Sequence, residues 1–358
     1  MSKTVRATAG NLLVVGLGST ELTSLERAWL KLVRPAGIIL FRRNIADAAQ
    51  TCVLLSDATA LCTPHSLRCV DVEGGTVDRL RDALAPMPSA QTVANANLAR
   101  EHGELVGRAV KAFGFNTTLA PVLDLALPSS CEVMGTRAAS PMSEGVVAYA
   151  RDFLRGLASE NVVGCGKHFP GLGASTKDSH LETPAIDRSA NELWRDDLAP
   201  YRELRNELPM VMVNHAAYPQ TPGGSRPASV SPYWITTVLR NRIGYNGLVF
   251  SDDLEMGGII KFIPIEDAVI AAVRAGMDLM EICHSPELIL RAYEALVTEA
   301  ERSKAFATLL AARAKRAAKL RARLFINKPA RTLTARQFDA LRTRVLRFGE
   351  KVAEAQGR

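Results

Sequence analysis

Two histidines, two lysines and an aspartate fall within residues 167–180, a stretch that also contains prolines and glycines. Lys167 and His168 end a short apolar run, and Asp178 and His180 lie in the glycine-containing stretch that follows it. A strand that ends at polar residues and opens into a loop is how many α/β enzymes present catalytic groups. The alternative is a surface loop whose polar residues have no function. A single histidine would favour that alternative, whereas two histidines with two lysines and an aspartate do not.

His180 is the candidate proton carrier, because imidazole changes charge near neutral pH. Asp178 lies two residues before it and could orient the ring and stabilise its charged form. An isolated Asp-x-His is more often an exposed histidine beside a helix-capping aspartate. The pair therefore needs a second catalytic group to support a function.

Asp252 supplies that second group, since it follows the apolar residues 248–250 and precedes Asp253. Neighbouring side chains on a strand point to opposite faces, so we expect one carboxylate to enter a pocket and the other to turn away. A helix cap or an arginine partner is the competing role. A nucleophilic carboxylate with a separate acid–base group is typical of retaining glycoside hydrolysis.

Sugar hydroxyls need charged hydrogen-bond partners around such a pair. The candidates are Asp71, Arg79, Arg137, Lys167 and His168.

A metal-dependent hydrolase is the alternative chemistry, with zinc on His168, His180, His215 and Asp252. The chain has no His-x-His after an early strand and no HExxH motif. Lys167 beside the site would also repel a cation. We therefore expect no metal.

Eight short apolar runs alternate with segments of helical periodicity, which predicts a parallel sheet. Eight such units over about 300 residues favour a single (β/α)8 TIM-type barrel. An open doubly wound sheet is less favoured, because Gly16 and Gly18 alone make a weak phosphate turn. The expected strands are residues 12–17, 37–41, 67–72, 117–123, 162–168, 209–213, 247–251 and 279–283. The expected helices are residues 21–33, 46–61, 94–113, 143–159, 190–207, 232–243, 265–275 and 285–299.

Polar residues follow most of these strands, at the end where a TIM barrel builds its active face. Those residues are Asp71, Glu73, Asp124, Lys167, His168, Asn214, His215, Asp252, Asp253, Glu281 and His284. Fold and site predictions thus agree with one another.

The chain has 358 residues, of which 47% are apolar, and no apolar run approaches the roughly 20 residues of a membrane span. The first residues lack the pattern of a signal peptide. Six cysteines are scattered without a CxxC pair. We expect reduced thiols in the cytoplasm.

Positive charge is concentrated in residues 301–358, which hold 16 Lys/Arg and 4 Asp/Glu, against 28 and 33 in the rest of the chain. We expect helices at 304–325 and 334–355, broken by Lys328-Pro329, with basic side chains extending into water. Nucleic-acid or membrane contact is the less favoured reading of the tail. The expected division is a catalytic domain over 1–327 and a helical tail over 328–358.

Several motifs together resemble glycoside hydrolase family 3, and within it the bacterial β-N-acetylglucosaminidases of the NagZ type. The two central ones are residues 167–171 (KHFPG) with 178–180 (DSH), and residues 250–256 (FSDDLEM). Others are 37–44 (GIILFRRN), 70–79 (VDVEGGTVDR), 120–124 (APVLD) and 226–234 (RPASVSPYW). The resemblance covers roughly residues 10–325.

The resemblance implies a TIM-type barrel that removes terminal N-acetyl-β-D-glucosamine with retention of configuration. It implies that Asp252 is the nucleophile and His180 the acid–base, assisted by Asp178. The sugar would be held by Asp71, Arg79, Arg137, Lys167 and His168. It further implies recycling of cell-wall muropeptides in the cytoplasm, with no metal or organic cofactor. We expect a monomer or weak homo-oligomer whose partner is the carbohydrate substrate.

The chain departs from the family pattern at Leu172, where histidine is common, at Thr76, and at Ala138-Ala139. We expect these changes to touch the loop and the pocket rim rather than the catalytic residues. A β-glucosidase, a glycoside phosphorylase or a degenerate sugar-binding protein of the same fold are the alternatives.

Overall fold

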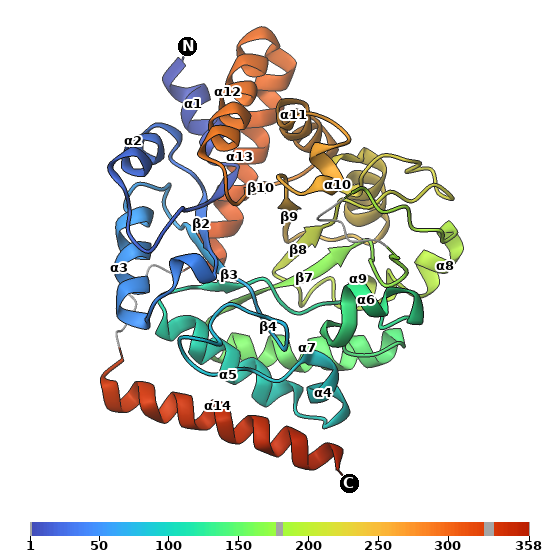
Figure 1. Ribbon diagram of the computed structural model, residues 1–358. Helices are drawn as coiled ribbons and strands as arrows, with labels where there is room; N and C mark the ends of the chain where they lie inside the picture. The colour runs from blue at the N-terminus through green and yellow to red at the C-terminus, as the bar shows by residue number, and fades with distance from the viewer. Residues whose placement is uncertain (1, 177–181, 326–332, 358) are drawn as a thin grey trace.

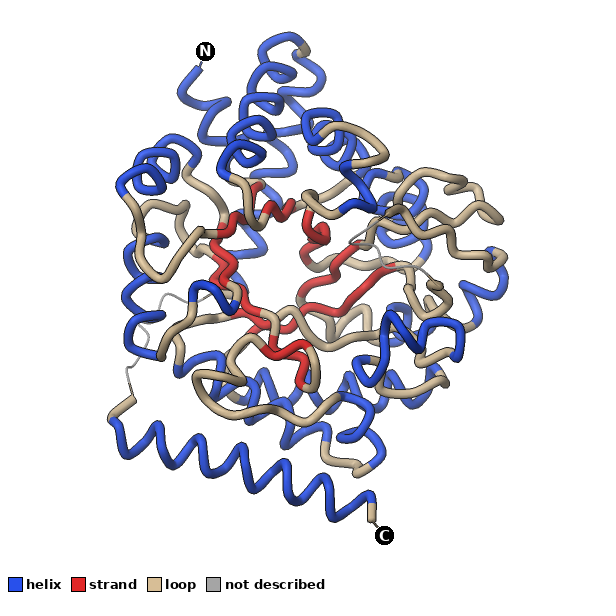
Figure 2. Tube along the Cα trace, in the orientation of Figure 1, coloured by secondary structure: helices blue, strands red, loops and turns tan. Residues whose placement is uncertain are grey.

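The computed structural model describes residues 2–176, 182–325 and 333–357 of the chain. Eight parallel strands form a closed barrel at the centre of the molecule, in the order β1-β10-β9-β8-β7-β6-β3-β2 (Figure 2). The strands are β1 (Leu13–Gly16), β2 (Gly37–Leu40), β3 (Leu67–Val70), β6 (Thr117–Thr118), β7 (Val163–Phe169), β8 (Met210–Val213), β9 (Leu248–Asp253) and β10 (Leu279–Ile282). The predicted TIM-type barrel is confirmed, and the open doubly wound sheet is excluded.

The barrel closes between its first and last strands. Val14 on β1 lies opposite Glu281 on β10 and opposite Gly37 on β2. A Cβ atom built on Gly16 would lie 1.8 Å from the carbonyl oxygen of Cys283. Only glycine permits this approach at the seam.

Helices surround the barrel on its outer face (Figure 1). They are α1 (Ser2–Gly10), α2 (Ser24–Val33), α3 (Ala48–Thr59), α4 (Ala90–Asn95), α5 (Ala99–Ala112), α6 (Cys131–Met134), α7 (Ser143–Ser159), α8 (Ala190–Arg195), α9 (Ala199–Glu203), α10 (Gly257–Ile260), α11 (Ile265–Ala275), α12 (Pro286–Arg302), α13 (Lys304–Leu324) and α14 (Ala335–Gln356). A two-stranded hairpin, β4 (Val72–Gly74) and β5 (Val77–Asp78), follows β3. None of the described helices is long and apolar enough to cross a membrane.

Two segments predicted as single helices are each broken. Residues 94–113 contain the end of α4 and all of α5, because Asn97 between them adopts a left-handed backbone with φ of 55°. Residues 190–207 contain α8 and α9, and Pro200 lies in the first turn of α9, where it needs no intrahelical hydrogen bond. The predicted helix at 232–243 is a π-helix over Tyr233–Arg242.

The last two helices carry the basic tail. On α14, Leu341, Val345, Phe348 and Val352 are buried at three- and four-residue spacing, and the helix packs on α4 and α5. The basic residues on α13 do not all extend into water, because Arg321 is 1% exposed. Its guanidinium donates to the carbonyl of Ala36 at 3.0 Å, and burial lowers the pKa of Arg321 to about 10. The division at 327/328 falls outside the described residues and stays a prediction.

Candidate active site

The candidate site lies at the carboxyl ends of the barrel strands. Asp71 follows β3, Lys167 and His168 lie close to the end of β7, and Asp252 is the last residue but one of β9. Parallel strands bring these ends to one face, so residues nearly 200 positions apart become neighbours. The peptide bond between Lys167 and His168 is cis, as is that between Phe169 and Pro170.

Lys167 binds two carboxylates. Its ammonium nitrogen lies 2.9 Å from Oδ1 of Asp71 and 2.6 Å from Oε1 of Glu73. Burial alone would lower the pKa of Lys167, but the two carboxylates outweigh burial and hold the pKa above its usual range. An ammonium has three donors, so one remains for a ligand.

Arg137 binds the other side of the Glu73 carboxylate. Its Nε and Nη2 groups donate to Glu73 at 2.8 and 2.9 Å in a bidentate pair. Burial would raise the pKa of Glu73, but Arg137 and Lys167 hold it well below its usual range. Arg79 completes the group, with Nη2 3.7 Å from Oδ2 of Asp71. The structure thus brings all five predicted sugar-binding residues together, since Nη2 of Arg137 lies 3.4 Å from Nε2 of His168.

His168 is fixed from below by Asp124. Nδ1 of His168 lies 2.6 Å from Oδ2 of Asp124, and Oδ1 of Asp124 accepts the backbone N–H of Leu172 at 2.7 Å. Leu172 lies in the loop that follows β7, as expected, but it is only 4% exposed and packs in the core. Its backbone supports the residue that orients His168.

Asp252 and Asp253 diverge as their neighbouring positions on β9 predict. Burial would raise the pKa of Asp252, but His168, His215 and Lys167 outweigh it and lower the pKa, so the carboxylate is ionised. Asp253 faces β10, where its Oδ1 accepts the N–H of Cys283 at 3.2 Å. Burial and the neighbouring Glu255 raise the pKa of Asp253 to about 7.

The other two predicted catalytic residues, Asp178 and His180, lie outside the described residues. Their roles stay predictions.

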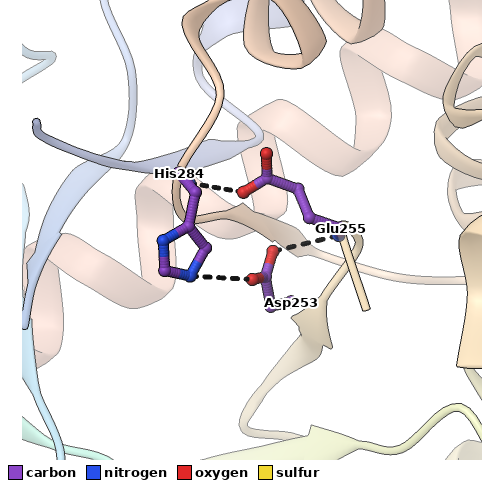
Figure 3. A group of neighbouring side chains, drawn as sticks. All are labelled: Asp253, Glu255 and His284. Carbon is purple, nitrogen blue, oxygen red and sulfur yellow. Dashed lines mark hydrogen bonds and ion pairs between the residues drawn. The ribbon is translucent and has the colours of Figure 1, made fainter. Parts of the chain in front are cut away.

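Asp253, Glu255 and His284 form a group whose ligand atoms all lie within 4.8 Å of one another, the arrangement that a metal would need (Figure 3). Glu255 is already occupied: it accepts the backbone N–H groups of Cys283 at 2.8 Å, of Ser285 at 2.7 Å, and of His284. These bonds hold the turn between β10 and α12.

The tautomer of His284 is fixed by its hydrogen-bond partner. Arg43 donates to Nδ1 of His284 at 2.9 Å, so the proton of a neutral ring lies on Nε2, 3.7 Å from Oδ2 of Asp253. A metal on Nε2 would have to displace that proton and tolerate the nearby guanidinium. We interpret the group as one that fixes the turn.

Two of the zinc ligands considered from the sequence, His168 and His215, have other partners as well. His168 faces Asp124 with one ring nitrogen and the Arg137 guanidinium with the other. Nδ1 of His215 lies 2.7 Å from the Ser229 hydroxyl and Nε2 lies 2.9 Å from the carbonyl of Asp253. Both ring nitrogens of each histidine thus face a protein group, so neither is directed at a metal site.

Sequence reasoning placed Glu73 and Asp124 at strand ends but gave them no role in the site. Glu73 joins Lys167 to Arg137, and Asp124 orients His168. The signal for Glu73 was its spacing of two residues from Asp71 in an extended segment, which directs both side chains to one face. Glu281 was likewise placed at a strand end without a role: it is buried, and burial together with Asp253 and Asp71 raises its pKa well above the usual range.

The described residues can therefore do two things chemically. A set of ammonium, guanidinium, imidazole and carboxylate groups can bind several hydroxyls of one sugar ring. An ionised carboxylate on Asp252, close enough to these cations for its pKa to be lowered by them, can act as a nucleophile or stabilise a developing positive charge.

Comparisons with known proteins agree with this chemistry. The model of the glycosyl hydrolase family 3 N terminal domain matches residues 4–320. A beta-hexosaminidase of Pseudomonas aeruginosa strain LESB58 is 36% identical over 291 residues, which cover 79% of this chain and 86% of that protein. A beta-hexosaminidase of Alkalilimnicola ehrlichii is 37% identical over 287 residues, covering 77% and 82%.

Solved structures give the same result. NagZ from Neisseria gonorrhoeae, in complex with N-trifluoroacetyl-D-glucosamine, is 30% identical with a TM-score of 0.71, covering 86% of this chain and 98% of that chain. A family 3 β-N-acetylglucosaminidase from Paenibacillus sp. str. FPU-7 is 29% identical with a TM-score of 0.84, covering 95% and 68%.

Proposed function

Since the chain belongs to glycosyl hydrolase family 3 and is a glycoside hydrolase with β-N-acetylhexosaminidase activity, we propose that it is a retaining exo-β-N-acetylglucosaminidase. It removes terminal, non-reducing N-acetyl-β-D-glucosamine. The observation that carries the proposal is the half-buried Asp252 carboxylate, whose pKa is lowered by His168, His215 and Lys167, on the face where Lys167, His168 and Arg137 are joined through Glu73. This arrangement supplies a nucleophile and a binding site for one sugar ring on the same face of the barrel.

In the first step, the Asp252 carboxylate attacks the anomeric carbon, and the bond to the leaving-group oxygen breaks. His180 donates a proton to that oxygen, and Asp178 stabilises the resulting change of charge. The product of this step is a glycosyl ester on Asp252.

In the second step, the now neutral His180 takes a proton from water, which attacks the same carbon. The ester bond breaks, and Asp252 returns to its ionised form. Two inversions at one carbon give net retention. The cations that lower the pKa of Asp252 also make it a good leaving group in this step.

The sugar hydroxyls are bound by Asp71, Arg79, Arg137, Lys167 and His168. Asp71 can accept hydrogen bonds from hydroxyl groups, whereas Lys167 and Arg137 donate them. Support for an N-acyl sugar comes from NagZ of Neisseria gonorrhoeae, whose structure contains N-trifluoroacetyl-D-glucosamine.

The proposed natural substrate is a muropeptide whose non-reducing end is N-acetylglucosamine, released during peptidoglycan recycling in the cytoplasm. A reducing compartment is supported by the six cysteines, all of which are free thiols.

The test is hydrolysis of p-nitrophenyl N-acetyl-β-D-glucosaminide, with the β-glucoside in parallel. Rapid release of p-nitrophenol from the N-acetyl sugar alone, with the β-anomer of the product formed first, is the expected result. Release from the glucoside alone would keep the mechanism and overturn the substrate. Release from neither would favour a sugar-binding protein without turnover.

A further inference from the structure

Glu281, on β10, is a buried side chain with an unsatisfied polar atom. It is 2% exposed, and its Oε1 atom has no hydrogen-bond partner among the described residues. A buried polar atom without a partner costs free energy, and most such atoms in native proteins meet a protein group or an ordered water. Glu281 is therefore a candidate to bind a ligand.

The backbone of Glu281 is fixed beside the proposed nucleophile. Its N–H donates to the hydroxyl of Ser251 at 3.0 Å, and its carbonyl accepts the N–H of Leu254 at 2.9 Å. Glu281 also pairs with Asp253 in the parallel register of β9 and β10. These contacts lie on both sides of Asp252 along β9, so Glu281 begins at the level of the catalytic face.

The side chain of Glu281 enters the interior of the barrel. Its carboxyl is close enough to Asp71, after β3, and to Lys167, on β7, for each of them to influence its pKa. It likewise raises the pKa of Cys69 and Cys165, which lie two residues before Asp71 and Lys167 and share their face. Neither β3 nor β7 is a neighbour of β10, whose partners in the barrel are β1 and β9 (Figure 1). A carboxyl that interacts with strands on both far sides of a closed barrel must lie inside it.

The surroundings of Glu281 favour the neutral acid over the carboxylate. Burial raises the pKa of Glu281 well above its usual range, and Asp253 and Asp71 raise it further. Lys167 opposes this shift but does not outweigh it. A neutral acid has an O–H donor, which a carboxylate lacks. Glu281 thus adds an uncharged donor to a site in which Lys167 and Arg137 are charged donors.

We propose that Glu281 is a further substrate-binding residue, whose neutral acid donates a hydrogen bond to a hydroxyl or to the acetamide of the bound sugar. This role rests on the proposed function, and it leaves the steps at Asp252 and His180 unchanged. Because β10 lies across the barrel from β3 and β7, Glu281 contacts the sugar from a side that Asp71 and Lys167 do not cover. A site built to bind one sugar oxygen discriminates against sugars that lack it.

The first test is the kinetics of Glu281→Leu on p-nitrophenyl N-acetyl-β-D-glucosaminide. Leucine has no polar atom, and an apolar side chain of similar size is commonly tolerated in place of a buried polar one. We expect kcat/KM to fall by about tenfold, mainly through a higher KM. Glu281→Gln restores a donor and should recover most of this loss. An unchanged kcat/KM in Glu281→Leu, or a glutamine variant as impaired as the leucine variant, would overturn the proposed hydrogen bond.

Met280→Leu is the matched control on the same strand. Met280 is 1% exposed, and as the neighbour of Glu281 it points to the opposite face of β10, away from the barrel interior. Methionine and leucine exchange at little cost in a core, so kcat/KM should stay within about twofold. An equal loss in Met280→Leu would show that any core change on β10 impairs the site, against a specific contact. Thermal unfolding is measured for every variant, and Glu281→Met replaces Glu281→Leu if the leucine variant does not fold.

Substrates that lack one group identify the part of the sugar that Glu281 contacts. The panel is the aryl N-acetylglucosaminide without its 3-, 4- or 6-hydroxyl, together with the β-glucoside, which has no acetamide. On the substrate that lacks the contacted group, the loss in Glu281→Leu should shrink from about tenfold to about twofold, as in a double-mutant cycle. An equal loss on all four substrates would mean that Glu281 acts through Asp252 and not on the sugar.

Direct binding separates the role of Glu281 from the proposed function. Titration calorimetry with N-acetylglucosamine, or with glucose if only the β-glucoside is hydrolysed, measures affinity without turnover. A wild-type protein that bound neither sugar would contradict the proposed function and, with it, the role of Glu281. Equal affinities of the wild type and Glu281→Leu would contradict the role of Glu281 alone.

Discussion

The ammonium nitrogen of Lys167, on β7, lies 2.6 Å from a carboxylate oxygen of Glu73, on β4. The same carboxylate receives two N–H groups from Arg137 at 2.8 and 2.9 Å. Glu73 is 3% exposed, so water cannot replace it as a partner. One buried carboxylate therefore fixes two of the cations proposed to bind the sugar, although it need not touch the sugar itself.

Glu73→Gln should lower both the free energy of unfolding and the affinity for the sugar. The amide has the shape of the carboxylate but no charge, so Lys167 and Arg137 lose the counterion that they share. Removing one partner of a buried ion pair typically lowers the free energy of unfolding by about 3–5 kcal/mol. We also expect KM for the aryl glycoside to rise more than kcat falls, since the residue positions binding groups. Urea unfolding and steady-state kinetics measure the two effects.

Glu207→Gln is the matched control for that variant. Glu207 pairs with Arg151 at 3.0 Å, but both side chains are about one-third exposed. An exposed pair contributes about 0–1 kcal/mol. If Glu73→Gln lost no more stability than Glu207→Gln, the bridging role of Glu73 would be wrong.

Asp252→Asn should abolish turnover while sugar binding survives. The amide cannot form the glycosyl ester, so kcat should fall by at least about 10³-fold. N-acetylglucosamine should still bind, because Asp71, Lys167 and Arg137 remain in place. A variant that retained near-normal kcat would remove Asp252 from the role of nucleophile.

His180→Ala should discriminate between leaving groups. A p-nitrophenolate leaves with little protonation, whereas a sugar alkoxide needs a proton, and general acid catalysis contributes about 10²–10⁴-fold. The loss in kcat/KM should therefore be much larger for a natural disaccharide than for the aryl glycoside. His65→Ala, at the base of the barrel where Nδ1 lies 2.8 Å from the Phe325 carbonyl, serves as the control. Equal losses on both substrates would argue against an acid role for His180.

The barrel could be predicted because its signal is local and repeated. Most strands are short runs of buried, largely apolar residues, and a helix-forming segment follows, so the periodicity of the sequence reports burial directly. Lys167, His168 and Asp252 followed from the same logic, because polar residues that end buried strands must meet at one face.

The pairings inside the site could not be predicted in this way. Glu73 contacts Lys167 across 94 positions of sequence, and nothing near Glu73 encodes which cation it binds. Leu172 could be placed in the loop from the sequence, but its burial could not be predicted, because burial depends on the packing around Asp124. Arg321 was read as a solvated charge for a similar reason, since the carbonyls that bind it belong to the distant residues Ala36, Pro64 and His65.

Asp197 should make the stability of the protein depend on pH. Burial raises the pKa of Asp197 to about 7, although Arg188 lies 3.2 Å away and opposes the shift. Between about pH 4 and pH 7 the folded chain therefore holds a proton that the unfolded chain has lost, so the contribution of Asp197 to the free energy of unfolding falls as pH rises through this window. Asparagine does not titrate. The free energy of unfolding of Asp197→Asn, measured relative to that of the wild type, should therefore rise by on the order of 2 kcal/mol from pH 5 to pH 8. Urea unfolding of both proteins at the two pH values measures this difference, and a constant difference would mean that Asp197 is ionised throughout.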